Sequence, residues 1–165
     1  MKKLLIALTM LISVNAFSLE VGEEAKCVVL DHVQTDNTVT SHCIREKEEG
    51  RKFTLIEFFS ITCSACQENL PKISSLANEL SDVATTRFVS IDRDINAVKN
   101  YINQKREFIS FEVALDNDRF ARKEYQVFAT PTLFILNENN QVVYKHVGVL
   151  SQTDLENIRN LTRGL

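Results

Sequence analysis

The sequence is poor in the residues and runs that mark several specialised classes of protein. It has no tryptophan, two prolines and four glycines among 165 residues, and no segment of low complexity. This composition excludes collagen-like chains and Pro/Gly-rich disordered chains. The formal net charge of −3 supplies no basic field, so we expect no nucleic-acid partner. Length and a hydrophobic content of 44% instead fit one globular domain with its own core.

No apolar run in the sequence reaches the roughly 20 residues that a membrane-spanning helix needs. The apolar run over residues 4–14 follows Lys2 and Lys3 and precedes small residues at Ala16 and Ser18. This order is typical of a secretory signal peptide cleaved after Ser18. We therefore expect residues 1–18 to be removed and residues 19–165 to form an exported, periplasmic domain in a compartment that permits disulfides. An uncleaved membrane anchor is the alternative.

Periodicity and turn residues predict an α/β protein with a mixed sheet, helices on both faces and an N-terminal β-hairpin. The hairpin covers residues 26–44, with turn residues at 35–37. The run FTLIEFF over residues 53–59 is rich in aromatic and aliphatic residues and predicts a buried central strand. The remaining expected strands are 86–91, 111–115, 131–136 and 141–147, and the expected helices are 63–80, 96–108, 120–125 and 152–161.

A Cys-x-x-Cys pair, Cys63 and Cys66, lies where the central strand gives way to a helix. The amino end of a helix carries partial positive charge and unpaired N–H groups, and both favour a thiolate on Cys63. The thiolate is the attacking species in disulfide exchange, and Cys66 lies one helical turn away, close enough to resolve a mixed disulfide. We therefore predict a redox-active pair with no bound cofactor.

Three other interpretations of the pair are less well supported by the sequence. A zinc site would need a second closely spaced ligand pair, whereas Cys27 and Cys43 are widely spaced on hairpin strands. A purely structural Cys63–Cys66 disulfide closes so small a loop that it stabilises the fold little. A copper site would need a histidine near a Cys-x-x-x-Cys pair, so we expect no metal.

Together these features resemble the thioredoxin-fold proteins, and within them the exported TlpA/ResA-like branch. The resemblance is carried by residues 53–71 (FTLIEFFSITCSACQENLP), by residues 128–148 (FATPTLFILNENNQVVYKHVG) and by the N-terminal hairpin. It implies a thioredoxin-like domain and thiol–disulfide exchange with protein substrates. The sequence departs from the family pattern at Thr62, where a tryptophan is usual, and at Asn69, where ResA-like proteins often have glutamate.

The resemblance also implies that Pro131 is a cis proline facing the cysteines. A cis bond bends the chain, and the backbone of Thr130 would then be available to pair with an extended substrate segment. On spacing alone, an ordinary trans proline at the start of an edge strand is the alternative.

Glu57 is an acidic residue inside the apolar central strand. Burial would raise the pKa of this carboxyl, and a carboxyl that titrates near neutral pH can move a proton. It matches the buried aspartate of thioredoxin, so we predict that it deprotonates Cys66. The alternative is a side chain that faces solvent or forms a salt bridge.

Cys27 and Cys43 lie on either side of the expected turn, with their midpoint at residue 35. We favour a structural disulfide between them across the hairpin. Two unpaired buried thiols and a second redox pair that passes electrons to Cys63–Cys66 are the alternatives.

The predicted function is dithiol–disulfide exchange, and the resemblance implies that its direction is reduction of exported proteins, for example of apocytochrome c before haem attachment. It implies a membrane-bound electron donor, and we expect a monomer. The alternatives are an oxidant of the DsbA type, a peroxidase, and a binding or chaperone-like module with a vestigial cysteine pair. The DsbA type carries a large helical insertion for which the middle segment is too short.

Overall fold

The computed structural model describes residues 19–34 and 36–164, so the expected signal peptide lies outside the described residues. The strands are β1 (Val29–Val33), β2 (Val39–Cys43), β3 (Phe53–Phe59), β4 (Ala84–Ser90), β5 (Val113–Leu115), β6 (Thr132–Leu136) and β7 (Val142–Val147). The helices are α1 (Ser64–Glu79), α2 (Ile95–Gln104), α3 (Phe120–Glu124) and α4 (Gln152–Arg163). None of these helices has the length and apolar character required to cross a membrane.

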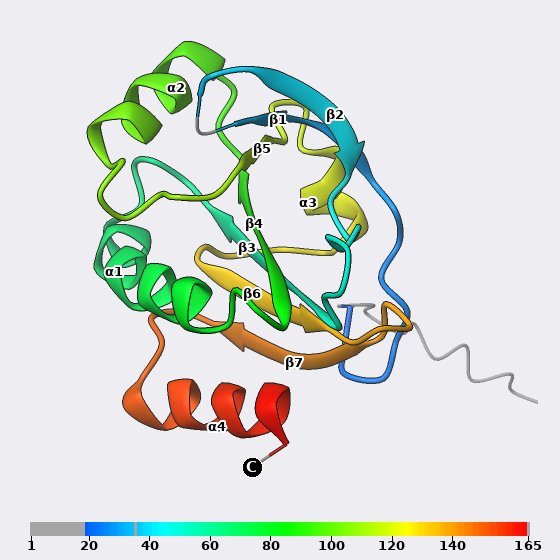
Figure 1. Cartoon of the computed structure of the whole chain (residues 1–165). Helices are drawn as coiled ribbons and strands as arrows, with labels where there is room; N and C mark the ends of the chain where they lie inside the picture. The colour runs from blue at the N-terminus through cyan, green and yellow to red at the C-terminus, as the bar shows by residue number, and fades with distance from the viewer. Residues whose placement is uncertain (1–18, 35, 165) are drawn as a thin grey trace, which may run out of the picture.

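All seven strands belong to one sheet, in the order β2-β1-β5-β4-β3-β6-β7 (Figure 1). The three central strands β3, β4 and β5 are parallel, whereas β6 and β1 run antiparallel to their neighbours. The hairpin of β1 and β2 extends one edge, and β7 forms the other. The predicted α/β fold with a mixed sheet and an N-terminal hairpin is therefore confirmed.

The central strand β3 separates two hydrophobic cores. Leu55 and Phe59 belong to the core that α1, α2 and α4 help to form, whereas Ile56 and Phe58 belong to the core that includes residues of α3 and its C-cap. Successive side chains of a strand point to opposite faces of the sheet. Glu57 therefore shares a face with Leu55 and Phe59, and this is the face covered by α1.

The hairpin register differs from the predicted one by two residues, since Cys43 pairs with Val29 rather than with Cys27. Val29 pairs with Cys43 and Val33 with Val39, so the turn is centred on residue 36 rather than 35. Its geometry is fixed by Asp36, whose Oδ1 accepts a hydrogen bond of 2.9 Å from the backbone N–H of Thr38. Because turn geometry sets the register of a hairpin, the symmetric placement of the cysteines does not determine it.

The shifted register leaves Cys27 outside β1, so Cys27 and Cys43 do not face each other as a strand pair. Their Cα atoms are nevertheless 5.5 Å apart, and their sulfur atoms are joined in a disulfide. This separation is in the usual range for a disulfide. The cross-link ties the segment that enters β1 to the end of β2.

Replacing both Cys27 and Cys43 by serine should lower the free energy of unfolding by about 3 kcal/mol. The disulfide closes a loop of 16 residues, and its loss increases the conformational entropy of the unfolded chain by that order. Urea denaturation of the oxidised protein and the variant measures the difference. A loss below about 1 kcal/mol would show that the hairpin does not depend on this cross-link.

Candidate active site

Cys63 and Cys66 lie at the junction of β3 and α1, as the sequence predicts. Cys63 is the N-cap residue of α1, and its Sγ accepts a hydrogen bond of 3.1 Å from the backbone N–H of Cys66. The two cysteines form a disulfide with a Cα separation of 5.2 Å. Once the bond is reduced, the same N–H group and the helix dipole favour a negative charge on the sulfur of Cys63.

The two sulfur atoms differ in their exposure to solvent. Cys63 is half-buried at the surface, whereas Cys66 is 4% exposed and belongs to the hydrophobic core. An incoming substrate can therefore approach the sulfur of Cys63 more readily than that of Cys66. The arrangement fits an accessible attacking cysteine with a sheltered resolving cysteine behind it.

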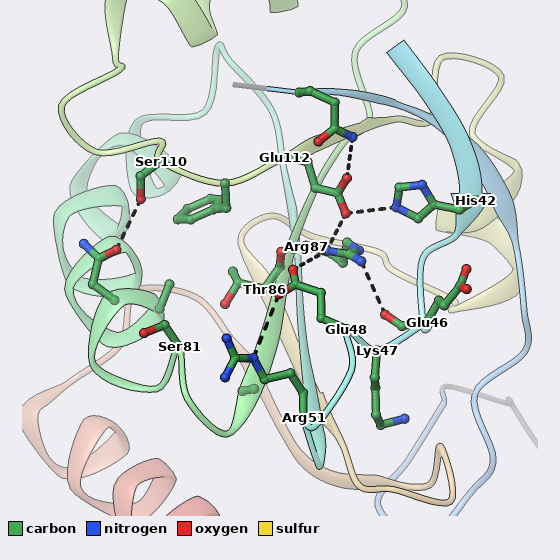
Figure 2. Close-up of a pocket in the computed structure, with 15 residues that line it drawn as sticks. His42, Glu46, Lys47, Glu48, Arg51, Ser81, Thr86, Arg87, Ser110 and Glu112 are labelled. Carbon is green, nitrogen blue, oxygen red and sulfur yellow. Dashed lines mark hydrogen bonds and ion pairs between the residues drawn. The ribbon is translucent and has the colours of Figure 1, made fainter. Parts of the chain in front are cut away.

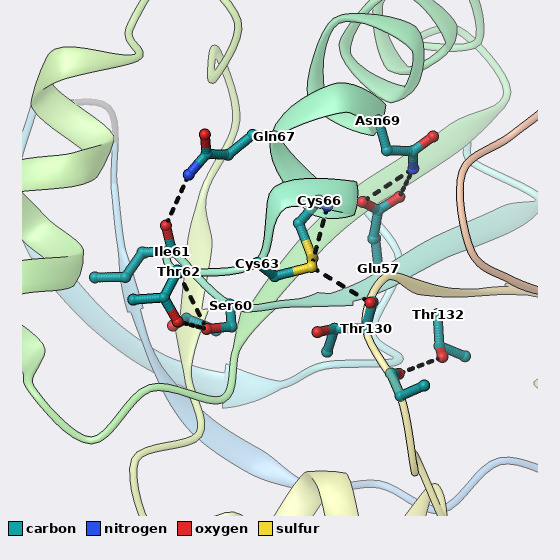
Figure 3. Close-up of a disulfide and its surroundings, with 12 residues drawn as sticks. Glu57, Ser60, Ile61, Thr62, Cys63, Cys66, Gln67, Asn69, Thr130 and Thr132 are labelled. Carbon is teal, nitrogen blue, oxygen red and sulfur yellow. Dashed lines mark hydrogen bonds between the residues drawn. A yellow bond between two sulfur atoms is a disulfide. The ribbon is translucent and has the colours of Figure 1, made fainter.

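The segment before β6 meets the disulfide from a distant part of the chain. The carbonyl oxygen of Thr130 lies 3.3 Å from Sγ of Cys63 (Figure 3). The peptide bond between Thr130 and Pro131 is cis. Pro131 is buried and Thr130 is half-buried. The structure thus places backbone groups of Thr130 beside the accessible sulfur.

Glu57 is buried beneath the first turns of α1. Its side chain is 2% exposed, and the side-chain amide of Asn69 donates hydrogen bonds of 3.2 and 3.1 Å to its two carboxyl oxygens (Figure 3). The backbone N–H of Leu150 donates to the amide oxygen of Asn69 at 2.9 Å, which fixes the orientation of that amide. Asn69 follows Cys66 by three residues, so the two side chains lie on the same face of α1.

Burial raises the pKa of the Glu57 carboxyl to about 8, while the hydrogen bonds from Asn69 act in the opposite direction. The carboxyl can therefore change its protonation state near the pH at which thiols ionise. Glu57 makes no salt bridge with any residue in the described part of the chain and does not face solvent, so the alternative interpretation of this residue is wrong.

The loop that leads into Cys63 is held by Asp92, a contact that the sequence did not predict. The carboxylate of Asp92 accepts hydrogen bonds from the hydroxyl of Ser60 at 2.7 Å and from the backbone N–H of Ile61 at 2.9 Å. It also accepts one from the hydroxyl of Ser90 at 2.9 Å. Asp92 therefore joins the end of β4 to the loop between β3 and α1.

Changing Asp92 to alanine should destabilise the fold by about 1–3 kcal/mol and slow disulfide exchange at least several-fold, because the loop before Cys63 loses its anchor. Asp94→Ala is the matched control. Asp94 caps α2 by accepting hydrogen bonds of 3.0 Å from the N–H groups of Asn96 and Ala97, and its loss should cost about 1 kcal/mol. Exchange rates and urea unfolding of both variants test the difference. Equal exchange rates in the two variants would contradict a positioning role for Asp92.

The sequence did not predict the roles of Asn69 and Asp92, because the residues that they contact lie far along the chain and form no motif with them. It also missed Phe128, an aromatic side chain that is 80% exposed two residues before Thr130. The Cys27–Cys43 disulfide is not part of this site, since β2 is the edge strand and lies four positions from β3 in the sheet.

The fold and the site together define a thioredoxin-like thiol–disulfide oxidoreductase. The Redoxin family profile matches residues 20–162, and the chain belongs to this family.

Among curated relatives, the sporulation thiol-disulfide oxidoreductase A of Bacillus subtilis is 24% identical over 123 residues, which are 72% of this chain and 73% of the relative. The thiol-disulfide oxidoreductase ResA of Bacillus thuringiensis is 24% identical over 140 residues, 84% of this chain and 76% of the relative. Among solved structures, a putative thiol:disulfide interchange protein DsbE from Chlorobium tepidum has a TM-score of 0.71 at 19% identity. That match covers 89% of this chain and 98% of the solved chain. It supports the thioredoxin-like fold.

Proposed function

We propose that the protein is exported and reduces disulfides in other exported proteins through Cys63 and Cys66. The observation that carries this proposal is the unequal setting of the two sulfur atoms. Cys63 caps a helix, is accessible, and lies 3.3 Å from the Thr130 carbonyl, whereas Cys66 is buried one turn further on. A purely structural disulfide has no need of an accessible sulfur beside the backbone of Thr130.

The proposed reaction begins with both cysteines reduced. The Cys63 thiolate attacks one sulfur of a substrate disulfide, the substrate S–S bond breaks, and one substrate thiolate leaves. The Cys66 thiolate then attacks Sγ of Cys63 and releases the second substrate thiolate. The substrate gains two electrons and, in water, two protons, and the protein is left with the Cys63–Cys66 disulfide. A donor dithiol, which we propose to be membrane-bound, restores the reduced pair.

Two further groups assist these steps in the proposal. The Glu57 carboxylate accepts the proton of Cys66 before that sulfur attacks, since its pKa of about 8 is close to that of a thiol. The backbone of Thr130, next to the buried Pro131, pairs with an extended segment of the substrate and aligns its disulfide with Cys63.

The direction of electron flow is supported by the middle of the chain. Between α1 and Pro131 the structure forms β4, α2, β5 and α3, of which the longest helix is the ten-residue α2. This part of the fold has no large helical insertion of the kind carried by the DsbA-type oxidants. One relative named above is a thiol-disulfide oxidoreductase ResA. On the resemblance to the TlpA/ResA-like branch, we extend the proposal to a role in cytochrome c maturation.

Export rests on the residues before Leu19. We propose that residues 1–18 are a cleaved signal peptide and that the mature protein acts as a monomer in the periplasm or an equivalent oxidising compartment. Expression of the whole chain in a bacterial host, followed by mass spectrometry of the periplasmic product, tests the first part. A product that begins at Leu19 is expected, and an unprocessed cytoplasmic product would contradict it.

The direction is tested by comparing two rates under the same conditions. The reduced protein should reduce the disulfides of insulin, and the oxidised protein should be much slower in oxidising a reduced, unfolded protein. A faster oxidation than reduction would reverse the proposed direction. No activity in either assay, with the fold intact by circular dichroism, would leave a binding module as the function.

A further inference from the structure

A second polar cluster lies at the opposite end of the parallel strands from the disulfide. It consists of His32 on β1, His42 on β2 and Glu112, the residue directly before β5 (Figure 2 shows the last two). Cys63 follows the carboxyl end of β3, whereas Glu112 precedes the amino end of β5, and β3, β4 and β5 are parallel. The cluster is therefore separate from the redox site.

The hairpin brings the two histidines onto one face of the sheet. His42 pairs with Leu30, and His32 pairs with Thr40, so the histidines are diagonal neighbours across the two strands. Their rings stack with centroids 3.7 Å apart and an angle of 17° between the ring planes. This stacking directs both imidazoles toward the carboxylate of Glu112 on the neighbouring strand.

The hydrogen bonds of His32 leave one buried nitrogen without a partner. Its side chain is 0% exposed, and Nε2 lies 3.3 Å from the backbone carbonyl of His42, to which it can only donate. In the neutral ring Nδ1 then carries a lone pair, and Nδ1 has no hydrogen-bond partner among the described residues. Oε1 of Glu112 lies 3.7 Å from this Nδ1. The lone pair of His32 Nδ1 and the carboxylate oxygen Oε1 of Glu112 thus face each other, and both side chains are largely shielded from solvent.

We propose that this cluster binds a divalent transition-metal ion, Zn²⁺ in the first instance, through His32 Nδ1, His42 Nε2 and Glu112 Oε1. The three atoms all lie within 4.8 Å of one another, and His42 Nε2 is 2.9 Å from Glu112 Oε1. In a tetrahedral zinc site with bonds of about 2.0–2.2 Å, ligand atoms are about 3.3 Å apart. Small side-chain movements are enough to reach that geometry.

The surroundings of the three ligands also resemble those of a metal site. The Nε2–H of His32, bound to the carbonyl of His42, fixes the ring orientation and the tautomer that presents Nδ1 to the ion. The side-chain amide of Gln34 donates a hydrogen bond of 2.6 Å to Oε2 of Glu112. Oε1 is then the oxygen that would bind the ion. A cavity of about 610 Å³ borders His42 and Glu112, and it gives the ion a path and room for a water molecule as fourth ligand (Figure 2).

Arg87 is the competitor of the ion. Its guanidinium forms an ion pair with Oε1 of Glu112. It also lies 3.8 Å from a carboxylate oxygen of Glu48 and 3.5 Å from the carbonyl of Glu46. A bound ion would shift Arg87 toward these two groups, so metal affinity should depend on the charge at position 87.

Zinc binding to the oxidised protein tests the proposal, because both disulfides are then closed and supply no thiolate. Isothermal titration of the mature chain with Zn²⁺ should show one ion per chain, and Co²⁺ should give the visible absorption of a four-coordinate site. His42→Ala should weaken binding at least tenfold. His146→Ala is the matched control, since His146 lies on β7 beside Asp154 and should leave binding unchanged.

Nuclear magnetic resonance of the unmodified protein keeps the test independent of how the variants fold. The chain has three histidines, so the ring signals are simple to assign. Zinc should shift the signals of Nδ1 in His32 and Nε2 in His42 and leave those of His146 in place. The absence of binding at 100 µM Zn²⁺, equal shifts of all three rings, or an affinity unaffected by His42→Ala would each overturn the proposal.

Discussion

A Cys66→Ser variant should accumulate as a mixed disulfide with its substrate, and a Cys63→Ser variant should form none and lose disulfide exchange by at least a thousandfold. The physical reason is the unequal exposure of the two sulfur atoms. Cys63 at the amino end of α1 meets the substrate, and only the buried Cys66 can release it. The change of one cysteine thus stops the reaction before attack, and the change of the other stops it after attack.

The variants are compared with a small disulfide-bonded protein as substrate, and the products are separated on non-reducing gels and identified by mass spectrometry. Both variants should carry Cys27→Ser and Cys43→Ser, so that any adduct is formed at the candidate site. Unfolding midpoints in urea serve as the control for the fold. Adducts that form on Cys66 in the Cys63→Ser variant would show that the roles of the two cysteines are reversed.

Glu57→Gln should stabilise the protein at alkaline pH and remove a pH dependence from the unmodified chain. The folded protein holds the pKa of this carboxyl at about 8, above its ordinary value of 4.5. Between these values the folded state retains a proton that the unfolded state has lost, so stability falls as pH rises from 4.5 to 8. At about 1.4 kcal/mol per pH unit, the loss is on the order of 5 kcal/mol.

The same substitution should change the pH dependence of resolution. In the unmodified chain, release of substrate from the Cys63 mixed disulfide should speed up as the Glu57 carboxylate forms near pH 8. The Gln variant should release substrate at least tenfold more slowly at pH 8. Asn69→Ala is the companion variant, since loss of its hydrogen bonds should raise the pKa of Glu57 and move the profile to higher pH. Identical pH profiles for all three proteins would rule out proton transfer by Glu57.

Much of the fold follows from local patterns in the sequence. The apolar run over residues 53–59 predicted the central strand β3 with the bounds that the structure shows. Other boundaries moved where local hydrogen bonds decide them. The helix expected over residues 96–108 ends at Gln104, because the N–H of Lys105 donates to the carbonyls of Tyr101 and Ile102 and closes the last turn.

The sequence predicted the part of the candidate site that lies within one short motif. It did not predict the contacts between residues that are far apart in the chain. The spacing of Cys63 and Cys66 at a strand–helix junction identifies them as a candidate redox pair. The partner of Glu57 is less evident, because Asn69 comes from the helix that packs above the strand. The His32–His42–Glu112 cluster had no sequence signal, because His42 and Glu112 are 70 residues apart.

The central claim is that Cys63 and Cys66 form a reducing thiol–disulfide couple. Its most direct test is the reduction potential of that couple, measured by equilibration with glutathione in a mature chain that carries Cys27→Ser and Cys43→Ser. We expect one reversible two-electron transition below about −220 mV, in the range of thioredoxin-like reductants. A potential near −120 mV, that of a strong oxidant, would contradict the proposed direction. The absence of a reversible transition would contradict the redox function itself.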